Sequence, residues 1–60
     1  MDYIILATET GRRLRTILRG SMGISYGAVK STKWENRILL NGSPTPVDAT
    51  VAAGDRVTFL

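Results

Sequence analysis

The sequence predicts a small α+β domain with the element order β-α-α-β-β-β, in which two helices pack on a small, mostly antiparallel sheet. Two stretches with helical periodicity lie in the first 36 of the 60 residues, and an Asn-Gly hairpin signal follows them. Short apolar runs with the composition of strands stand near both ends of the chain. The length suits one domain with a compact core and modest stability.

The first strand and the first helix are expected in the first 19 residues. Residues 3–7 form an apolar run that begins with aromatic and β-branched side chains, which is typical of a strand. Thr10 is a candidate N-cap, because its hydroxyl can accept a hydrogen bond from a free backbone N–H. The first helix is expected over residues 11–19, with an apolar face at i, i+3 and i+4. That face consists of Leu14, Ile17 and Leu18.

Two glycines, Gly20 and Gly23, are expected to end the first helix, because glycine tolerates the left-handed conformation of a helix end. Ser25 is the candidate N-cap of a second helix over residues 26–34. Asn36 is a candidate for the left-handed residue that ends it. The inner face of this helix is weak and consists of Ala28, Val29 and Thr32.

Three strands are expected after the helices. Residues 38–40 form a buried strand, and the Asn-Gly pair at 41–42 predicts a type I′ hairpin turn, which needs positive φ at both central residues. The returning segment, residues 43–47, contains two prolines, which confine it to a sheet edge or an irregular path. Residues 56–60 form the last strand after a Gly-Asp turn. Its inward face consists of Val57 and Phe59.

Composition excludes several classes of function. The chain has no cysteine and no histidine, so it lacks a thiolate nucleophile and the commonest metal ligand and general base. Asp48 and Asp55 are isolated carboxylates, and no glycine-rich phosphate loop is present. We therefore expect no catalytic residue, no metal and no cofactor. The longest apolar run is far shorter than the about 20 residues of a membrane span, which favours a cytoplasmic domain with no membrane partner.

Positive charge is concentrated in one segment. Residues 12–37 hold seven of the eight basic residues and a single acid, Glu35, and the excess of +6 contrasts with −3 for the remainder of the chain. Clustered cations are typical of nucleic-acid binding, because a phosphate backbone relieves their repulsion. Arg12, Arg15 and Arg19 are expected to form a stripe along the first helix. The cluster consists of Arg12, Arg13, Arg15, Arg19, Lys30, Lys33 and Arg37.

Two aromatic residues accompany the lysines of the second helix. Tyr26 and Trp34 can stack on unpaired bases, and the alternative is that they pack in the core, as most tryptophans in small domains do. The helical phase places both on the lysine side, away from Val29. Both interpretations stay open at this point.

The order of several short motifs resembles the S-four RNA-binding domain, which is named after ribosomal small-subunit protein four. The closest resemblance is to the version of this domain at the N-terminus of the RluA/RluD-type RNA pseudouridine synthases. It covers almost the whole chain, from Tyr3 to Leu60. The motifs are Gly23-Ile24-Ser25, Lys30 with Lys33, the run Arg37–Pro44, and the run Val51–Val57.

This resemblance implies an RNA-binding face made by the two helices and the turn after them. Tyr26 stands where the family often has arginine, which exchanges one phosphate contact for a possible stacking contact. The implied partner is structured ribosomal or transfer RNA. The chain would be a monomeric N-terminal fragment, and the catalytic aspartate would lie in a downstream domain. Carried over to this chain, the face consists of Arg13, Ser25, Tyr26, Lys30, Lys33 and Arg37.

Two other classes of protein stay open. Carrier proteins with a β-grasp fold also have an Asn-Gly turn and a Gly-Asp pair before the last strand, but they need a Gly-Gly tail, and this chain ends in Phe59-Leu60. Two helices before the hairpin would favour the S-four domain over the β-grasp fold. The third class is a protein-interaction module that docks on its own catalytic domain or on an acidic partner.

Overall fold

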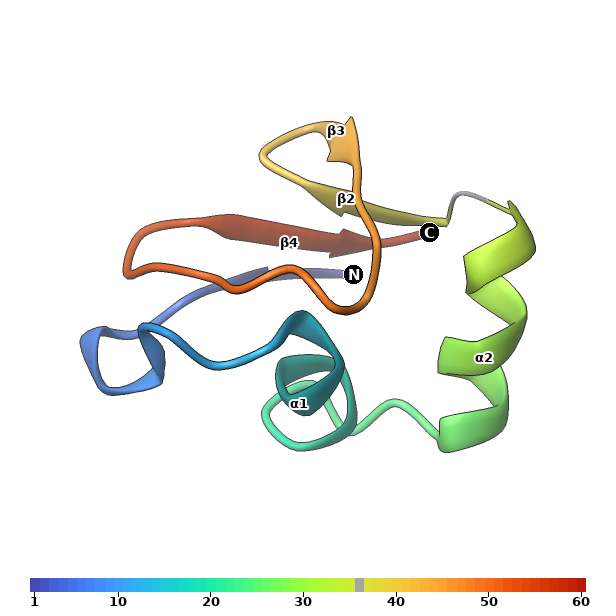
Figure 1. Cartoon of the computed structure of the whole chain (residues 1–60), viewed down its shortest axis with the longest axis horizontal. Coiled ribbons are helices and arrows are strands. Elements are labelled where there is room, and N and C mark those ends of the chain that lie inside the picture. Colours follow the sequence, from blue (N-terminus) through green and yellow to red (C-terminus); the bar gives the residue numbers. More distant parts are fainter. Residues whose placement is uncertain (36) are drawn as a thin grey trace.

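The computed structural model of the chain describes the backbone of residues 1–35 and 37–60 and the side chains of residues 1–30 and 37–60. Across the described residues it contains four strands and two α-helices in the order β-α-α-β-β-β, which confirms the predicted fold class (Figure 1). All strand pairs are antiparallel. In Figure 1, α1 lies along one side of the sheet, and α2 stands beside the end where β2 begins.

The last strand is the centre of the sheet. The strand order is β1-β4-β2-β3. Strand β4 (Arg56–Phe59) pairs on one side with β1 (Asp2–Ile4) and on the other side with β2 (Ile38–Leu40). Within it, Val57 is fully buried. The first and last segments of the chain are therefore neighbours, although they are far apart in sequence.

The predicted hairpin is confirmed. Leu40 pairs with Ser43, so the loop between the two strands has two residues, Asn41 and Gly42. Their φ angles are +53° and +84°, as a type I′ turn requires. Strand β3 (Ser43–Pro44) is short and lies at the sheet edge, where a proline that lacks an N–H is tolerated.

Strand β1 ends earlier than predicted. It stops at Ile4, and the chain turns into a short 3-10 helix, Ala7–Glu9, inside a region that was predicted to be strand and then loop. Ile5 leaves the ladder, and its N–H donates to the carbonyl of Asp55 at 2.9 Å. The carboxylate of Glu9 accepts the N–H of Leu6 at 2.8 Å, which stabilises the start of this short helix.

Helix α1 (Leu14–Arg19) begins three residues later than predicted. Thr10 is not its N-cap, so that prediction is wrong. The hydroxyl of Thr10 instead accepts the N–H of Ala53 at 3.1 Å, and Arg13 occupies the cap position with an extended backbone.

The late start of α1 has a tertiary cause. The N–H of Gly11 donates to the carbonyl of Val51 at 2.8 Å, and Val51 returns a bond to the carbonyl of Arg12 at 3.0 Å. The N–H of Leu14 then donates to the carbonyl of Ala49 at 2.8 Å. Residues 11–13 are thus held against the 49–51 segment in a non-helical conformation, and this pairing replaces the first helical turn that local propensity favours.

Helix α2 (Tyr26–Glu35) extends one residue beyond the prediction. The Ser25 hydroxyl accepts the N–H of Ala28 at 3.2 Å, which confirms Ser25 as the N-cap. Gly23 adopts a left-handed conformation with φ of +68° in the connection between the helices. The predicted roles of Thr32 and Asn36 lie outside the described residues.

The core lies between the helices and the sheet. The predicted inner face of α1 is confirmed, because Leu14, Ile17 and Leu18 are 0% exposed. No helix in the described part of the chain is long and apolar enough to cross a bilayer. The buried apolar side chains are Ile5, Leu14, Ile17, Leu18, Ile24, Val29, Ile38, Val51 and Val57.

Candidate nucleic-acid interface

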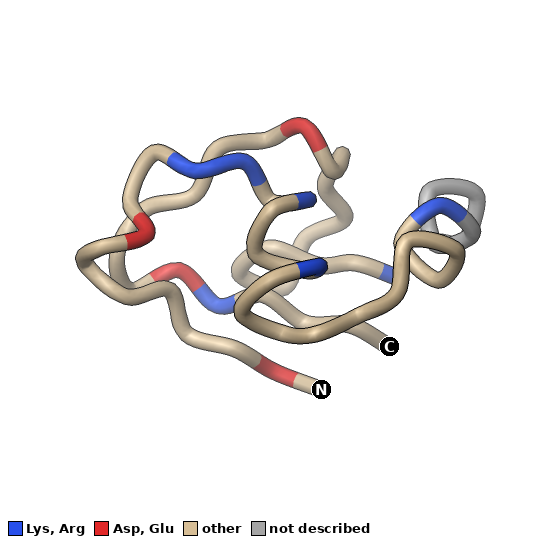
Figure 2. Tube along the Cα trace, turned by 90° about the horizontal axis from the view of Figure 1, so that it is seen from below, with Lys and Arg blue, Asp and Glu red and all other residues tan. Residues whose placement is uncertain are grey.

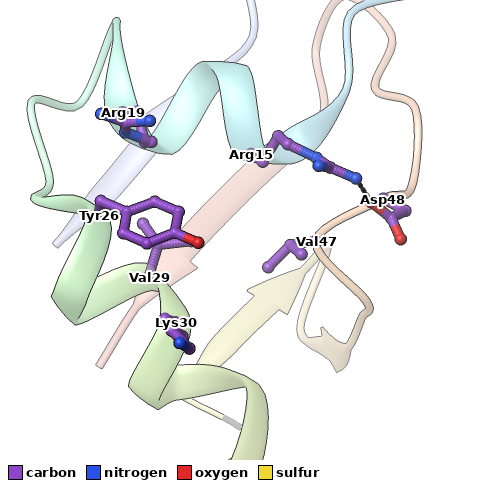
Figure 3. Close-up of a pocket in the computed structure, with 7 residues that line it drawn as sticks. All are labelled: Arg15, Arg19, Tyr26, Val29, Lys30, Val47 and Asp48. Carbon is purple, nitrogen blue, oxygen red and sulfur yellow. Dashed lines mark ion pairs between the residues drawn. The ribbon is translucent and has the colours of Figure 1, made fainter.

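Helices α1 and α2 and the segment at residues 47–48 border a cleft of about 400 Å³ (Figure 3). The basic residues of this cleft come from both helices, and an aromatic ring lies among them. Two valines provide its apolar part, and one carboxylate stands at the far side from the tyrosine. The lining residues are Arg15, Arg19, Tyr26, Val29, Lys30, Val47 and Asp48.

Helical spacing explains the two cationic walls. Arg15 and Arg19 lie one turn apart on α1, and Tyr26 and Lys30 lie one turn apart on α2, so each pair shares a face. All four side chains are exposed. The buried residues of α1 take the other side of that helix, which leaves the arginines toward solvent. The sequence predicts the three basic residues as part of the basic cluster and Tyr26 as a candidate for stacking, and the structure places all four around one cleft.

The third wall was not predicted. The first N–H groups of α1 have no side-chain cap and are satisfied by backbone carbonyls of a distant segment. Arg15 donates its backbone N–H to the carbonyl of Val47 at 2.9 Å. This bond fixes Val47 and Asp48 beside α1. The position of these two residues beside α1 follows from this long-range hydrogen bond. Neither residue belongs to a sequence motif for RNA binding.

Arg15 and Asp48 form an ion pair, marked by the dashed line in Figure 3. Their side chains are 52% and 61% exposed. Exposed pairs of this kind stabilise a fold by about 0–1 kcal/mol, because water screens both charges. The pair therefore matters more for the charge of the cleft than for stability: Asp48 neutralises one arginine and leaves Arg19 and Lys30 without an acidic partner among the described residues.

Tyr26 is 61% exposed, so its ring is not part of the core. The guanidinium carbon of Arg19 lies 5.2 Å from the centroid of the Tyr26 ring, which is within the range of a cation–π contact. This contact places the two side chains next to each other at the border of the cleft. Of the two interpretations for the aromatic residues, core packing is thus excluded for Tyr26. The side chain of Trp34 lies outside the described residues.

The other basic residues whose side chains the structure describes do not line the cleft. Arg12 and Arg13 are exposed in the extended segment before α1, so the predicted helical stripe is wrong for Arg12. Arg37 is half-buried at the sheet, where its Nε donates to the carbonyl of Leu60 at 3.3 Å and its guanidinium faces Phe59. The side chain of Lys33 lies outside the described residues.

Figure 2 shows the larger distribution of charge. Basic positions follow one another from the segment before α1, across α1, to α2, and the acidic positions are scattered around them. Ser25, which the resemblance places on the binding face, is exposed, and its hydroxyl is engaged as the cap of α2. Among the described residues, Arg15, Arg19 and Lys30 lie on the two helices, whereas Arg37 and Arg56 lie at the sheet.

Glu9 is a buried carboxylate that no motif in the sequence indicates. It is 4% exposed and accepts hydrogen bonds from the hydroxyls of Ser21 and Tyr3 and from the N–H of Leu6. These bonds, the one from Ser21 foremost, hold the pKa of Glu9 below its ordinary value, and the nearby Arg12 charge acts in the same direction. The only hint in the sequence is that an acid follows Leu6 by three residues. At this spacing, a carboxylate can accept the backbone N–H of the residue that precedes a short helix.

Asp55 and Asn41 join the two turns at one end of the sheet. The N–H of Ala52 and the side-chain amide of Asn41 donate to the Asp55 carboxylate at 2.9 and 3.1 Å, and these bonds lower the pKa of Asp55. The side-chain oxygen Oδ1 of Asn41 accepts the backbone N–H of Arg56 at 2.9 Å. Both residues thus have a structural role in the turns.

Among the described residues, no group of three or more histidine, cysteine, aspartate or glutamate side chains is placed to hold a metal ion. No protein-family model matches the chain, and no significant match was found among curated proteins or solved structures. The assignment of a function therefore depends on the chemistry of the cleft and of the basic surface around it.

Proposed function

We propose that this domain is an RNA-binding module that holds structured RNA against the basic surface of α1 and α2. The observation that carries the proposal is the convergence of Arg15, Arg19 and Lys30 from two helices on one cleft with an exposed tyrosine. Arginine and lysine at such a surface bind phosphates, which position the RNA. The shape of the RNA and its 2′-hydroxyl groups then favour folded RNA over DNA.

The resemblance to the S-four domain extends the proposal to a longer protein. In that protein the domain anchors a downstream catalytic domain of an RNA pseudouridine synthase to ribosomal or transfer RNA. The domain itself binds, and the chemistry belongs to the downstream part. The two helices before the hairpin support this proposal over a β-grasp carrier.

The electrostatic mechanism predicts a steep salt dependence. If the domain neutralises about four phosphates, the logarithm of the association constant falls with the logarithm of salt concentration at a slope of about −3 on single-stranded RNA and nearer −4 on a duplex stem. Titration of a labelled RNA stem-loop at 50 and 200 mM salt, followed by fluorescence anisotropy, measures this slope. Equal affinity at the two salt concentrations would exclude phosphate contacts as the main source of binding.

A further inference from the structure

The cleft between the helices has two chemically different ends. Arg19 and Lys30 place positive charge near the Tyr26 ring. Asp48 places a carboxylate at the other end, and in Figure 3 Val29 and Val47 lie between the two. A ligand that suits this cleft therefore combines an anionic group, a flat apolar part and N–H donors.

We propose that the cleft binds a single unpaired nucleotide of the RNA, with its base stacked on Tyr26. The phosphate of this nucleotide lies at Arg19 and Lys30, and N–H groups on the edge of the base donate to the Asp48 carboxylate. This inference rests on the proposed function and narrows it from structured RNA to RNA with an unpaired or bulged nucleotide. Sequence-specific recognition of RNA by proteins generally uses such exposed bases.

The size of the cleft supports one nucleotide rather than a helix. Ligand pockets in proteins are typically about 300–1,000 Å³, and this cleft of about 400 Å³ is at the small end of that range. A base that remains paired in a duplex cannot present its face to Tyr26, because its neighbours in the stack cover it. The base must therefore be unpaired to enter.

Asp48 distinguishes a nucleotide from a simple anion. A carboxylate repels phosphate but accepts N–H groups, and the ionised form offers about four acceptor sites on its two oxygens. Arg15 occupies the Oδ1 atom of Asp48, so acceptor capacity remains. Arg19 stays next to the Tyr26 ring through its cation–π contact, which places a charge close to where the base stacks.

The test uses three versions of one RNA hairpin: fully paired, with a single-nucleotide bulge, and with an abasic site in the bulge. Binding is measured for the native domain, Tyr26→Phe and Tyr26→Ala. We expect the native domain and Tyr26→Phe to prefer the bulged hairpin over the other two by about tenfold, which corresponds to the stacking of one base. We expect Tyr26→Ala to lose that preference, so that it binds the three hairpins with equal affinity.

Each outcome decides between the two proposals. Equal affinity of the native domain for all three hairpins, with a steep salt dependence, would overturn the nucleotide site and leave the RNA-binding function standing. A loss on Tyr26→Ala that is equal for all three hairpins would also overturn the site. Failure of the native domain to bind any hairpin at low salt would overturn both. Tyr26 is exposed, so circular dichroism should show that all three proteins are folded.

Discussion

At the scale of single residues, the molecule depends on a few polar side chains that join distant segments. Glu9 connects Tyr3 of the first strand with Ser21 after α1 through hydrogen bonds to its carboxylate. A buried carboxylate with several donors is well satisfied only when it is ionised. The fold in this region therefore depends on the charge of one side chain, although a sequence scan gives that residue no special status.

Glu9 should make the stability of the domain sensitive to acid. The pKa of Glu9 is lowered in the folded state. The contribution of Glu9 to the free energy of unfolding is therefore fully present above its ordinary pKa of 4.5, and it is lost as the pH falls through the lower pKa of the folded state. We expect the urea midpoint of the native domain to fall below about pH 4.5. In Glu9→Gln the midpoint should be lower at pH 7, because an amide offers N–H groups to the same donors, and it should fall less with acid.

The control for this experiment is Asp2→Asn, which removes an exposed acid that makes no side-chain hydrogen bond or ion pair within the described part of the chain. It should keep the native pH profile. Part of the acid sensitivity should survive in Glu9→Gln, since the pKa of Asp55 is also lowered. A pH profile of Glu9→Gln that equals the native one would contradict the role of the Glu9 carboxylate.

Asp48 sets the charge of the cleft, so Asp48→Asn should release Arg15 for contact with phosphate. On a fully paired hairpin, the salt slope should become steeper by about 1, because one more phosphate is neutralised. The free energy of unfolding should change by less than about 1 kcal/mol, because the lost ion pair is exposed. Anisotropy titrations at several salt concentrations measure the slope. Asp2→Asn, with the same change in charge outside the cleft, should leave it unchanged.

At the scale of elements, the sequence predicted the parts whose signals are local. The Asn-Gly turn, the cap of α2 at Ser25 and the apolar face of α1 each depend on neighbours within a few residues, and all three are confirmed. The start of α1 was wrong, because the decisive bonds join residues 11–14 to residues 49–51. Local propensity contains no information about such a partner.

Two glycines offer a matched test of backbone conformation. Gly42 has φ of +84° in the hairpin turn, whereas Gly27 lies within α2, and a Cβ atom would meet nothing within 4 Å at either position. Gly42→Ala should therefore lower the free energy of unfolding by about 1–2 kcal/mol through strain alone. Gly27→Ala should raise it by up to about 1 kcal/mol through helix propensity. Urea denaturation measures both, and equal effects of the two changes would contradict this explanation.

At the scale of the whole molecule, the basic surface was predictable in composition and only partly in shape. The excess of cations in residues 12–37 is visible in the sequence. The sequence does not show that the described cations separate into a cleft, an extended segment and a sheet contact. That separation depends on how α1, α2 and β4 meet. Arg37, for example, is half-buried against Phe59 rather than beside Lys30. Asp48 could be found only after the fold placed it next to Arg15.

The position of charge, rather than its amount, should decide RNA affinity. Lys30→Glu changes a residue of the cleft, and Arg56→Glu makes the same change in charge at an exposed arginine of β4 that lines a different depression. Lys30→Glu should weaken binding to a stem-loop severalfold and lower the salt slope by about 1, as the loss of one phosphate contact requires.

Arg56→Glu should have a much smaller effect at moderate salt, where charges beyond about 10 Å are screened. Fluorescence anisotropy at the same salt concentration compares the two variants, and circular dichroism checks that each is folded. Equal losses of affinity would show that net charge, not the surface of the two helices, controls binding.

The central place of β4 in the sheet has a consequence for the synthesis of the protein. Both β1 and β2 find their partner in residues 56–59, so the early segments have no completed sheet while the ribosome is still adding the middle of the chain. The four-stranded sheet cannot form until β4 has emerged from the ribosome. The pairing of β1 and of β2 with β4 therefore forms only after residues 56–59 have been translated.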